Sequence, residues 1–132
     1  MDTSNSGYRL LELIALSGEF SPGLVVRLGI SPSYSEKLIT RLKEQKYIKT
    51  HYKDRLRGYR LTSSGKKLLL ARNPDRFLFY LSGRSETNQP RSSLPRRQRL
   101  QYASHVYVIL QNAEITFFRD QKPLLFRESA DY

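Results

Sequence analysis

The sequence predicts a mainly α-helical fold with one small β-hairpin and a C-terminal helical extension. Three observations predict it. Apolar residues recur at helical spacing in several segments before residue 46 and again after residue 62. A serine followed by proline, a pair typical of a helix N-terminus, occurs at Ser21-Pro22 and at Ser31-Pro32. Between residues 47 and 62 the pattern changes to the alternation that is typical of paired strands.

Three helices are expected before residue 46. The first covers residues 8–16, is apolar on more than one face and is followed by Gly18 as a stop, so we expect it to pack between other elements. A short second helix starts after Ser21-Pro22 and ends at Gly29. Ser31-Pro32 starts the third helix after a very short turn. Two helices joined so closely must cross steeply, which is the geometry of a helix-turn-helix.

The third helix is expected to have two unlike faces. Its inward stripe follows spacings of three and four, and consists of Tyr34, Ser35, Leu38, Leu42 and Gln45. Its outward face is polar from end to end, with Arg41 on a flank, and consists of Ser33, Glu36, Lys37, Thr40, Lys43 and Glu44. The outward face is therefore expected to be exposed.

A β-hairpin and a fourth helix are expected next. Residues 47–52 and 59–62 are typical of short strands, with Gly58 available for the turn between them. Thr62 or Ser63 can cap a helix through residues 66–70, and the proline of Asn73-Pro74 interrupts it. Residues 75–81 are expected to add an amphipathic turn or two.

The composition divides the chain into three parts. Residues 1–81 form the expected domain, and residues 82–97 are polar with glycine and proline, as in a mobile linker. Residues 98–132 are expected to hold the rest of a helix that starts near Arg97, a short hairpin, and the start of a truncated downstream region. The helix carries an apolar stripe that leaves two alternatives open, a homodimer seam or ordinary core: Leu100, Ala103, Val106, Tyr107 and Leu110.

The charge balance indicates a polyanionic partner. The chain has 132 residues, with 23 Lys and Arg against 12 Asp and Glu, a net charge of +11. Each phosphate that a basic side chain neutralises releases condensed counterions, which favours binding. On charge alone, an anionic membrane surface or a generally basic, soluble protein remain alternatives.

Several function classes are not expected. There is no cysteine, and the two histidines, His51 and His105, are far apart in sequence, so neither thiol chemistry nor a metal site is expected. Paired carboxylates, a glycine-rich phosphate loop and a nucleophile–base pair are missing, so the chain is expected to be neither an enzyme nor a cofactor carrier. No apolar run is long enough for a membrane span and the N-terminus is unlike a signal peptide, so a cytoplasmic location is expected.

Five segments within residues 8–71 resemble the winged helix-turn-helix family, in particular its MarR- and PadR-like bacterial regulators. In order they match the second helix and turn, the recognition helix, the first wing strand, the wing and the Leu-Thr-x-x-Gly signature: Leu24–Ser31, Ser31–Leu42, Lys46–Ile48, Asp54-Arg55 and Leu61–Leu69. Lys46 stands where the family has glycine, so a left-handed backbone there would be mildly strained. The chain after Leu81 does not match the family's long dimerisation helices.

The resemblance implies sequence-specific binding of double-stranded DNA, with the third helix in the major groove and the hairpin as a wing along the phosphates. The helix residues expected to contact DNA are Ser31, Ser33, Tyr34, Lys37, Thr40 and Arg41. The hairpin residues are Lys49, Lys53, Arg55, Arg57 and Arg60. Every charged residue from Lys46 to Lys67 is basic except Asp54, which favours phosphate contact over the alternative of a merely solvated hairpin.

The resemblance indicates a transcriptional regulator and leaves two alternatives. One is an N-terminal DNA-targeting domain of a larger mobile-element or replication protein, whose enzymatic activity lies outside this chain. The other is a winged-helix protein-interaction module, because the same fold also serves in assemblies without DNA. A cluster of Arg91, Arg96, Arg97 and Arg99 is expected either to follow the DNA backbone or to belong to a disordered basic linker.

Overall fold

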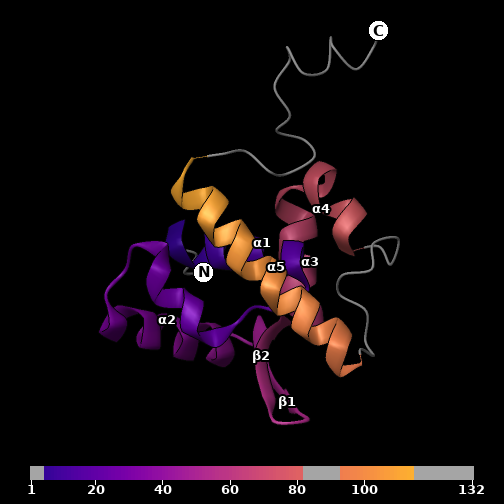
Figure 1. Cartoon of the computed structure of the whole chain (residues 1–132). Coiled ribbons are helices and arrows are strands. Elements are labelled where there is room, and N and C mark those ends of the chain that lie inside the picture. Colours follow the sequence, from indigo (N-terminus) through magenta and orange to yellow (C-terminus); the bar gives the residue numbers. More distant parts are fainter. Residues whose placement is uncertain (1–4, 82–92, 115–132) are drawn as a thin grey trace, which may run out of the picture.

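The computed structural model describes residues 5–81 and 93–114 of the chain, which are mainly helical with one small antiparallel sheet (Figure 1). This confirms the predicted fold class at that level. The elements in order are α1 (Asn5–Ser17), the 3-10 helix η1 (Pro22–Leu28), α2 (Pro32–Glu44), β1 (Ile48–Lys53), β2 (Leu56–Leu61), α3 (Ser63–Arg72), α4 (Pro74–Leu81) and α5 (Leu94–Asn112). Among these helices, none is both long enough and apolar enough to cross a membrane.

Helix α1 is the centre of the fold. Every residue from Leu10 to Phe20 is buried, because α5, α3, α4 and β2 all pack around this helix and the turn after it. Gly18 ends α1 with a φ of 84°, and its amide donates to the Ile14 carbonyl at 2.7 Å. The prediction that this helix packs between other elements is confirmed.

The two Ser-Pro pairs start η1 and α2, as predicted. Ser31 caps α2, since its hydroxyl oxygen accepts a hydrogen bond from the Tyr34 amide at 3.2 Å. Gly29 ends η1 with a φ of 83°, a conformation that glycine adopts without a steric penalty. Leu38 and Leu42 of the predicted inward stripe are buried, and so is Ile39, which that stripe left out.

The hairpin turns at Asp54-Arg55, and the prediction of a turn at Gly58 is wrong. Lys53 pairs with Leu56, so only two residues connect the strands. Asp54 and Arg55 have φ values of 55° and 61°, as a two-residue hairpin turn with both central residues left-handed requires. Gly58 lies inside β2 opposite His51.

A buried contact explains the glycine at position 58. A Cβ atom there would overlap the Glu19 carboxylate and lie 2.6 Å from Gln101 Nε2. An isolated antiparallel bridge extends the sheet beyond β2, because Phe20 and Tyr59 exchange two backbone hydrogen bonds of 2.9 Å. The segment after α1 and the N-terminal half of α5 therefore both lie against β2.

The C-terminal part of the fold differs from the predicted boundaries. Thr62 caps α3 by accepting from the Gly65 amide at 3.1 Å, and α4 confirms the short helix expected after residue 74. Helix α5 starts at Leu94, so the predicted linker 82–97 is wrong at its end: Ser93 caps α5 by accepting from the Arg96 amide at 3.3 Å. The rest of that linker and the hairpin expected after residue 114 lie outside the described residues.

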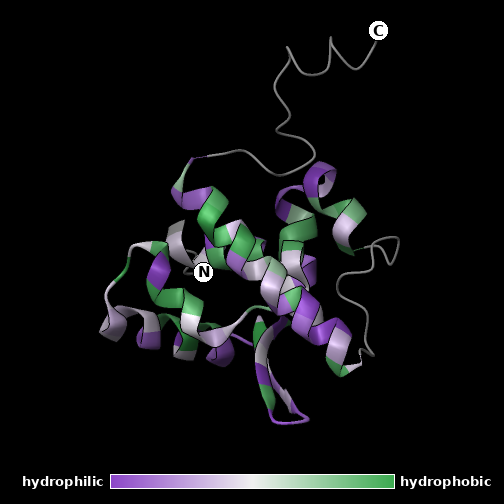
Figure 2. Cartoon of the chain, viewed as in Figure 1, coloured by the Kyte–Doolittle hydropathy of each residue, from purple (hydrophilic) through white to green (hydrophobic). Residues whose placement is uncertain are grey.

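Of the apolar stripe on helix α5, for which core packing and a homodimer seam were the alternatives, Leu100 is buried, Val106 is exposed and the other three residues are half-buried. The residues that it buries are Arg97, Leu100, Gln101, Ser104 and Val108, of which only Leu100 belongs to that stripe. The N-terminal half of α5 is hydrophilic and its C-terminal half largely hydrophobic (Figure 2). Two polar residues of this half, Arg97 and Gln101, are buried because the carboxylate of Glu19 lies beneath them and accepts their hydrogen bonds.

Candidate functional site

Helix α2 presents a continuous polar face to solvent. The exposed residues on and before it are Ser31, Ser33, Glu36, Lys37, Thr40, Lys43 and Glu44, whereas Tyr34 and Arg41 are half-buried. The opposite face is fixed in the core by Ser35, Leu38 and Leu42. The helix therefore cannot rotate, and its predicted contact residues lie on its outer side or on a flank.

The hairpin lies beside α2, and its side chains alternate between two faces. One face holds Tyr52 opposite Arg57 and Thr50 opposite Tyr59. This face is turned toward α2, since Lys43 Nζ lies 5.3 Å from the centre of the Tyr59 ring. The Arg57 guanidinium lies 5.5 Å from the centre of the Tyr52 ring, and this cation–π contact holds the Arg57 side chain at the exposed end of the hairpin.

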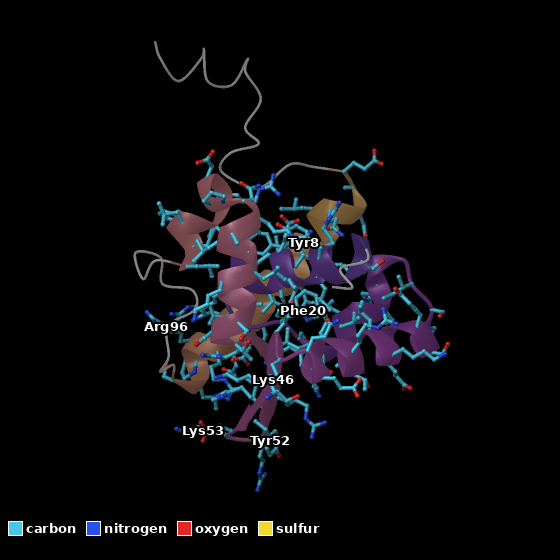
Figure 3. The ribbon with its side chains drawn as sticks, turned by 180° about the vertical axis from the view of Figure 1, so that it is seen from behind. Tyr8, Phe20, Lys46, Tyr52, Lys53 and Arg96 are labelled. Atoms are coloured by element: carbon cyan, nitrogen blue, oxygen red, sulfur yellow. The ribbon has the colours of Figure 1, made fainter. Side chains whose placement is uncertain are left out.

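The other face of the hairpin is turned toward α5. It holds Lys53 opposite Leu56, His51 opposite Gly58 and Lys49 opposite Arg60. Tyr52 and Lys53 lie at the free end of the hairpin, well away from Tyr8 of α1 (Figure 3). The predicted basic residues thus do not share one surface: Arg57 is on the α2 side, Lys49 and Lys53 are on the α5 side, and Arg55 is in the turn.

Arg60 does not lie on the predicted contact surface. It is only 8% exposed, and its Nε donates to Glu19 Oε1 at 2.8 Å. The alternation of the strand points Arg60 inward beside Gly58, and the buried carboxylate offsets the cost of removing its charge from water. The prediction that Arg60 contacts a partner is therefore corrected.

Glu19 is the centre of a buried polar cluster. Its carboxylate is fully buried and accepts hydrogen bonds from Arg60 Nε at 2.8 Å, Gln101 Nε2 at 2.6 Å and the guanidinium of Arg97 at 2.9 Å. Burial by itself raises the pKa of Glu19, but the hydrogen bonds from Arg97, Gln101 and Arg60 outweigh it and hold the pKa below its ordinary value. Glu19 is therefore ionised at neutral pH.

Arg97 connects this cluster to the hairpin backbone. Its Nη1 donates to the Lys53 carbonyl at 2.8 Å, and its Nη2 donates to the carbonyls of His51 at 3.2 Å and Leu56 at 2.8 Å. Gln101 adds a hydrogen bond of 2.8 Å to the Arg57 carbonyl. Both alternatives stated for Arg97, a DNA-backbone contact and a disordered linker, are therefore wrong.

Sequence reasoning missed the buried cluster, although one signal was present. Arg97, Gln101, Ser104 and Val108 follow helical spacings of four, three and four, which marks one face of α5. Since three of the four are polar, hydrophobic periodicity does not detect this face. His51 belongs to the same region: burial lowers its pKa first, and the nearby Arg97 and Arg60 charges lower it further.

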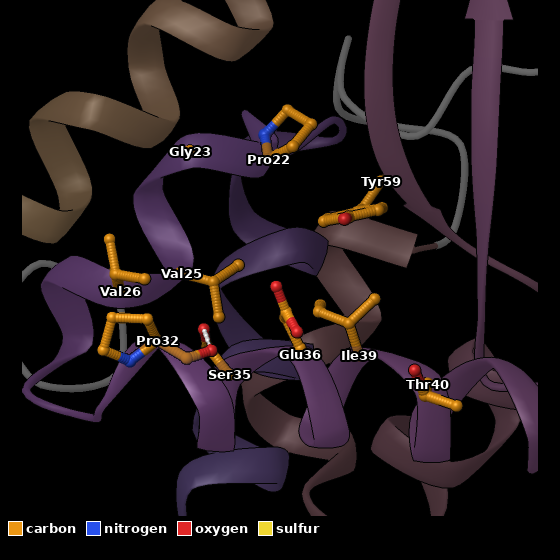
Figure 4. Close-up of a pocket in the computed structure, with 10 residues that line it drawn as sticks. All are labelled: Pro22, Gly23, Val25, Val26, Pro32, Ser35, Glu36, Ile39, Thr40 and Tyr59. Carbon is orange, nitrogen blue, oxygen red and sulfur yellow. Dashed lines mark hydrogen bonds between the residues drawn. The ribbon is translucent and has the colours of Figure 1, made fainter.

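An open groove of about 500 Å³ lies between η1 and α2 (Figure 4). Its walls include Val25, Val26 and Ile39, and Tyr59 of β2 closes one end. The Glu36 side chain extends from α2 into it. Within residues 5–81 and 93–114, no group of three or more His, Cys, Asp or Glu side chains is arranged to hold a metal ion.

The C-terminal helix has an exposed apolar side. Tyr102 and Ile109 are 71% and 65% exposed, and Val106 lies between them on the same side of α5. Leu100 and Val108 pack into the interior instead. Of the stripe for which core packing and a homodimer seam were the alternatives, Leu100 therefore lies in the core and Val106 on the exposed side. Comparisons of the chain with protein-family models, with curated proteins and with solved structures found no match.

Proposed function

We propose that this chain binds double-stranded DNA as a winged helix-turn-helix module, with α2 as the recognition helix and the β1–β2 hairpin as the wing. The observation that carries the proposal is the exposed polar face of α2 beside a hairpin with exposed basic side chains, in a chain of net charge +11. An α-helix with its side chains is about 10–12 Å wide, which suits a major groove about 12 Å wide.

The exposed residues of α2 have the chemistry to read bases. Lys37 can donate to guanine O6 and N7 or to a phosphate, and Thr40 can donate to or accept from a base edge. Arg41, on the flank, can reach a guanine or the backbone. Glu36 can accept from the amino group of cytosine.

The exposed basic residues of the hairpin suit phosphates rather than bases. Arg55 in the turn and Arg57 on the α2 side carry charge at the free end of the hairpin, and Lys53 adds charge on the other face. Contacts of this kind hold the protein on any duplex and make its affinity depend on salt. Together with base contacts from α2, they would give the sequence-specific binding that suits a transcriptional regulator. The same module would serve as the DNA-targeting part of a larger replication or mobile-element protein.

Selection from a random duplex library tests the proposal and identifies the preferred site. We expect one enriched motif and a salt slope that reflects about four to eight phosphate contacts. Replacing Arg55 and Arg57 with alanine should weaken all duplexes equally and lower the slope by about two. Lys37→Ala should instead change the preferred sequence. Arg9→Ala serves as the control, because it removes one exposed positive charge from α1, beside Leu28 and Gln111 and not from the hairpin.

Two results would refute parts of the proposal. If the wild-type chain binds no duplex at low salt, DNA binding itself is refuted and protein interaction becomes the better reading of the fold. If Lys37→Ala loses the same affinity on selected and random duplexes, α2 is not the recognition helix.

A further inference from the structure

We propose that Arg97 is a positioning residue for DNA binding: from α5 it holds the free end of the hairpin in the shape that contacts phosphates. Helix α5 is then part of the DNA-binding unit rather than an appendage. This inference rests on the proposed function for its DNA part, whereas the claim that Arg97 holds the hairpin stands on the contacts alone.

The planar geometry of the Arg97 guanidinium lets this one side chain connect Glu19 to the hairpin backbone. Arg97 is fully buried, and its planar fork donates on one side to the Glu19 carboxylate and on the other to three hairpin carbonyls. A lysine ammonium has all its donors on a single nitrogen, so it cannot reach the Glu19 carboxylate and the hairpin carbonyls at the same time. The hold therefore depends on arginine at this position and not only on a positive charge.

The three carbonyls lie where the hairpin needs support. Lys53 and Leu56 are the last paired residues before the turn, and His51 lies two residues further back, opposite Gly58. A two-stranded hairpin is marginally stable by itself. This one also has Asp54 and Arg55 in left-handed conformations that cost energy for residues other than glycine.

The supported carbonyls lie next to the basic side chains that the proposed function uses. Arg97 binds the backbone of Lys53 itself, and Gln101, one turn along α5, binds the backbone of Arg57. Arg55 lies in the turn between the Lys53 and Leu56 carbonyls. A hairpin held in one shape presents its charges without a further loss of conformational freedom on binding.

The contacts also separate this role from a general contribution to stability. Arg97 binds the hairpin and Glu19, whereas the apolar core around α1 is built from other side chains. Weakening Arg97 should therefore release the hairpin first and leave α1 protected, because local opening follows the contacts that are lost. A residue that is only structural would instead loosen α1 and the hairpin together.

The test compares Arg97→Lys with Arg99→Lys, the same change at an exposed position of α5, in the full chain. Amide hydrogen exchange and affinity for the selected duplex are measured for both. For Arg97→Lys we expect exchange in β1 and β2 to rise at least about tenfold more than exchange in α1. Affinity should fall by about five- to twentyfold and the salt slope by about one. Arg99→Lys should change neither exchange nor affinity by more than about twofold.

Three outcomes would overturn the inference. Unchanged exchange in the hairpin would show that Arg97 does not hold it. Faster exchange with unchanged affinity would show that the hold does not matter for DNA. If Arg97→Lys loosens α1 equally, Gln101→Ala is measured in the same way, because it removes only the bonds to Glu19 and to the Arg57 carbonyl. Equal loosening of α1 and the hairpin in that variant too would make the role general stability.

If the wild type binds no duplex, the proposed function fails and the DNA part with it, while the exchange result still decides whether Arg97 holds the hairpin.

Discussion

Replacing Glu19 with glutamine tests a fully buried ion pair of the fold. The change keeps the shape of the side chain and removes its charge. Arg97, which is fully buried, and Arg60, which is nearly so, would then lose the carboxylate that compensates their charges. Breaking a buried pair by removing one partner leaves an uncompensated charge and costs about 3–5 kcal/mol of stability.

This loss is large against the total stability of a small domain, which is about 5–15 kcal/mol. Glu12→Gln is the matched control, since it removes another buried carboxylate that pairs with two arginines, from α1 just before Glu19. Its partners keep more access to water: the side chains of Arg9 and Arg76 are 54% and 14% exposed. Because those guanidinium groups can be solvated after the change, we expect a loss of only about 1–2 kcal/mol.

Urea unfolding at neutral pH measures both variants, with stability compared at an unchanged m-value. The pH dependence gives a second readout. The folded pKa of Glu19 lies below its ordinary value, so its contribution is fully present above that ordinary value and is lost as pH falls through the folded pKa. The difference between wild type and Glu19→Gln should therefore shrink in acid. A loss below about 1 kcal/mol, a loss equal to that of Glu12→Gln, or a difference that persists in acid would refute the reasoning.

Three further predictions follow from single positions. Lys46 has a φ of 63° after α2, so Lys46→Gly should raise the free energy of unfolding by about 0.5–1 kcal/mol, and a lower urea midpoint would contradict this. The pKa of His51 is lowered by burial and by the nearby arginines, so the stability it contributes is present above its unfolded pKa and is lost as pH falls through the folded value. The Tm should therefore fall less between pH 7 and pH 5 for His51→Gln than for wild type. The homodimer predicted through the C-terminal helix would use its exposed side, so Ile109→Glu should separate the two copies in sedimentation velocity, and a monomeric wild type would exclude the dimer.

Local signals predicted most of the helices and the existence of the hairpin. Ser31 and Thr62 cap helices because their hydroxyls satisfy amides only a few residues away, and Gly18 ends α1 through its own backbone conformation. These causes act within one turn of chain, so a sequence shows them directly. The outward face of α2 was predictable for the same reason, since Leu38 and Leu42 fix which side is buried.

The buried polar cluster could not be predicted in that way. Arg97 is separated from Glu19 by 78 positions, and charged residues are rarely buried unless they are paired. Gly58 was assigned to a turn because glycine is common in turns, whereas its position is explained by the close approach of Glu19 and Gln101. Both errors have one physical origin: the cause is a contact made only after distant segments meet.

The same contacts change how the net charge should be understood. Arg60 and Arg97 count toward +11, yet the structure uses both to compensate a single buried carboxylate. Their charges are therefore withheld from direct contact with a polyanion, and the positive charges available on the hairpin are those of the exposed residues Lys49, Lys53, Arg55 and Arg57. If the proposed function holds, the salt slope should respond to these four residues and not to Arg60, whose loss would instead leave the Glu19 carboxylate undercompensated. A variant at Arg60 should accordingly lower stability while leaving the salt slope of the folded protein unchanged, and a changed slope would show that its charge reaches DNA after all.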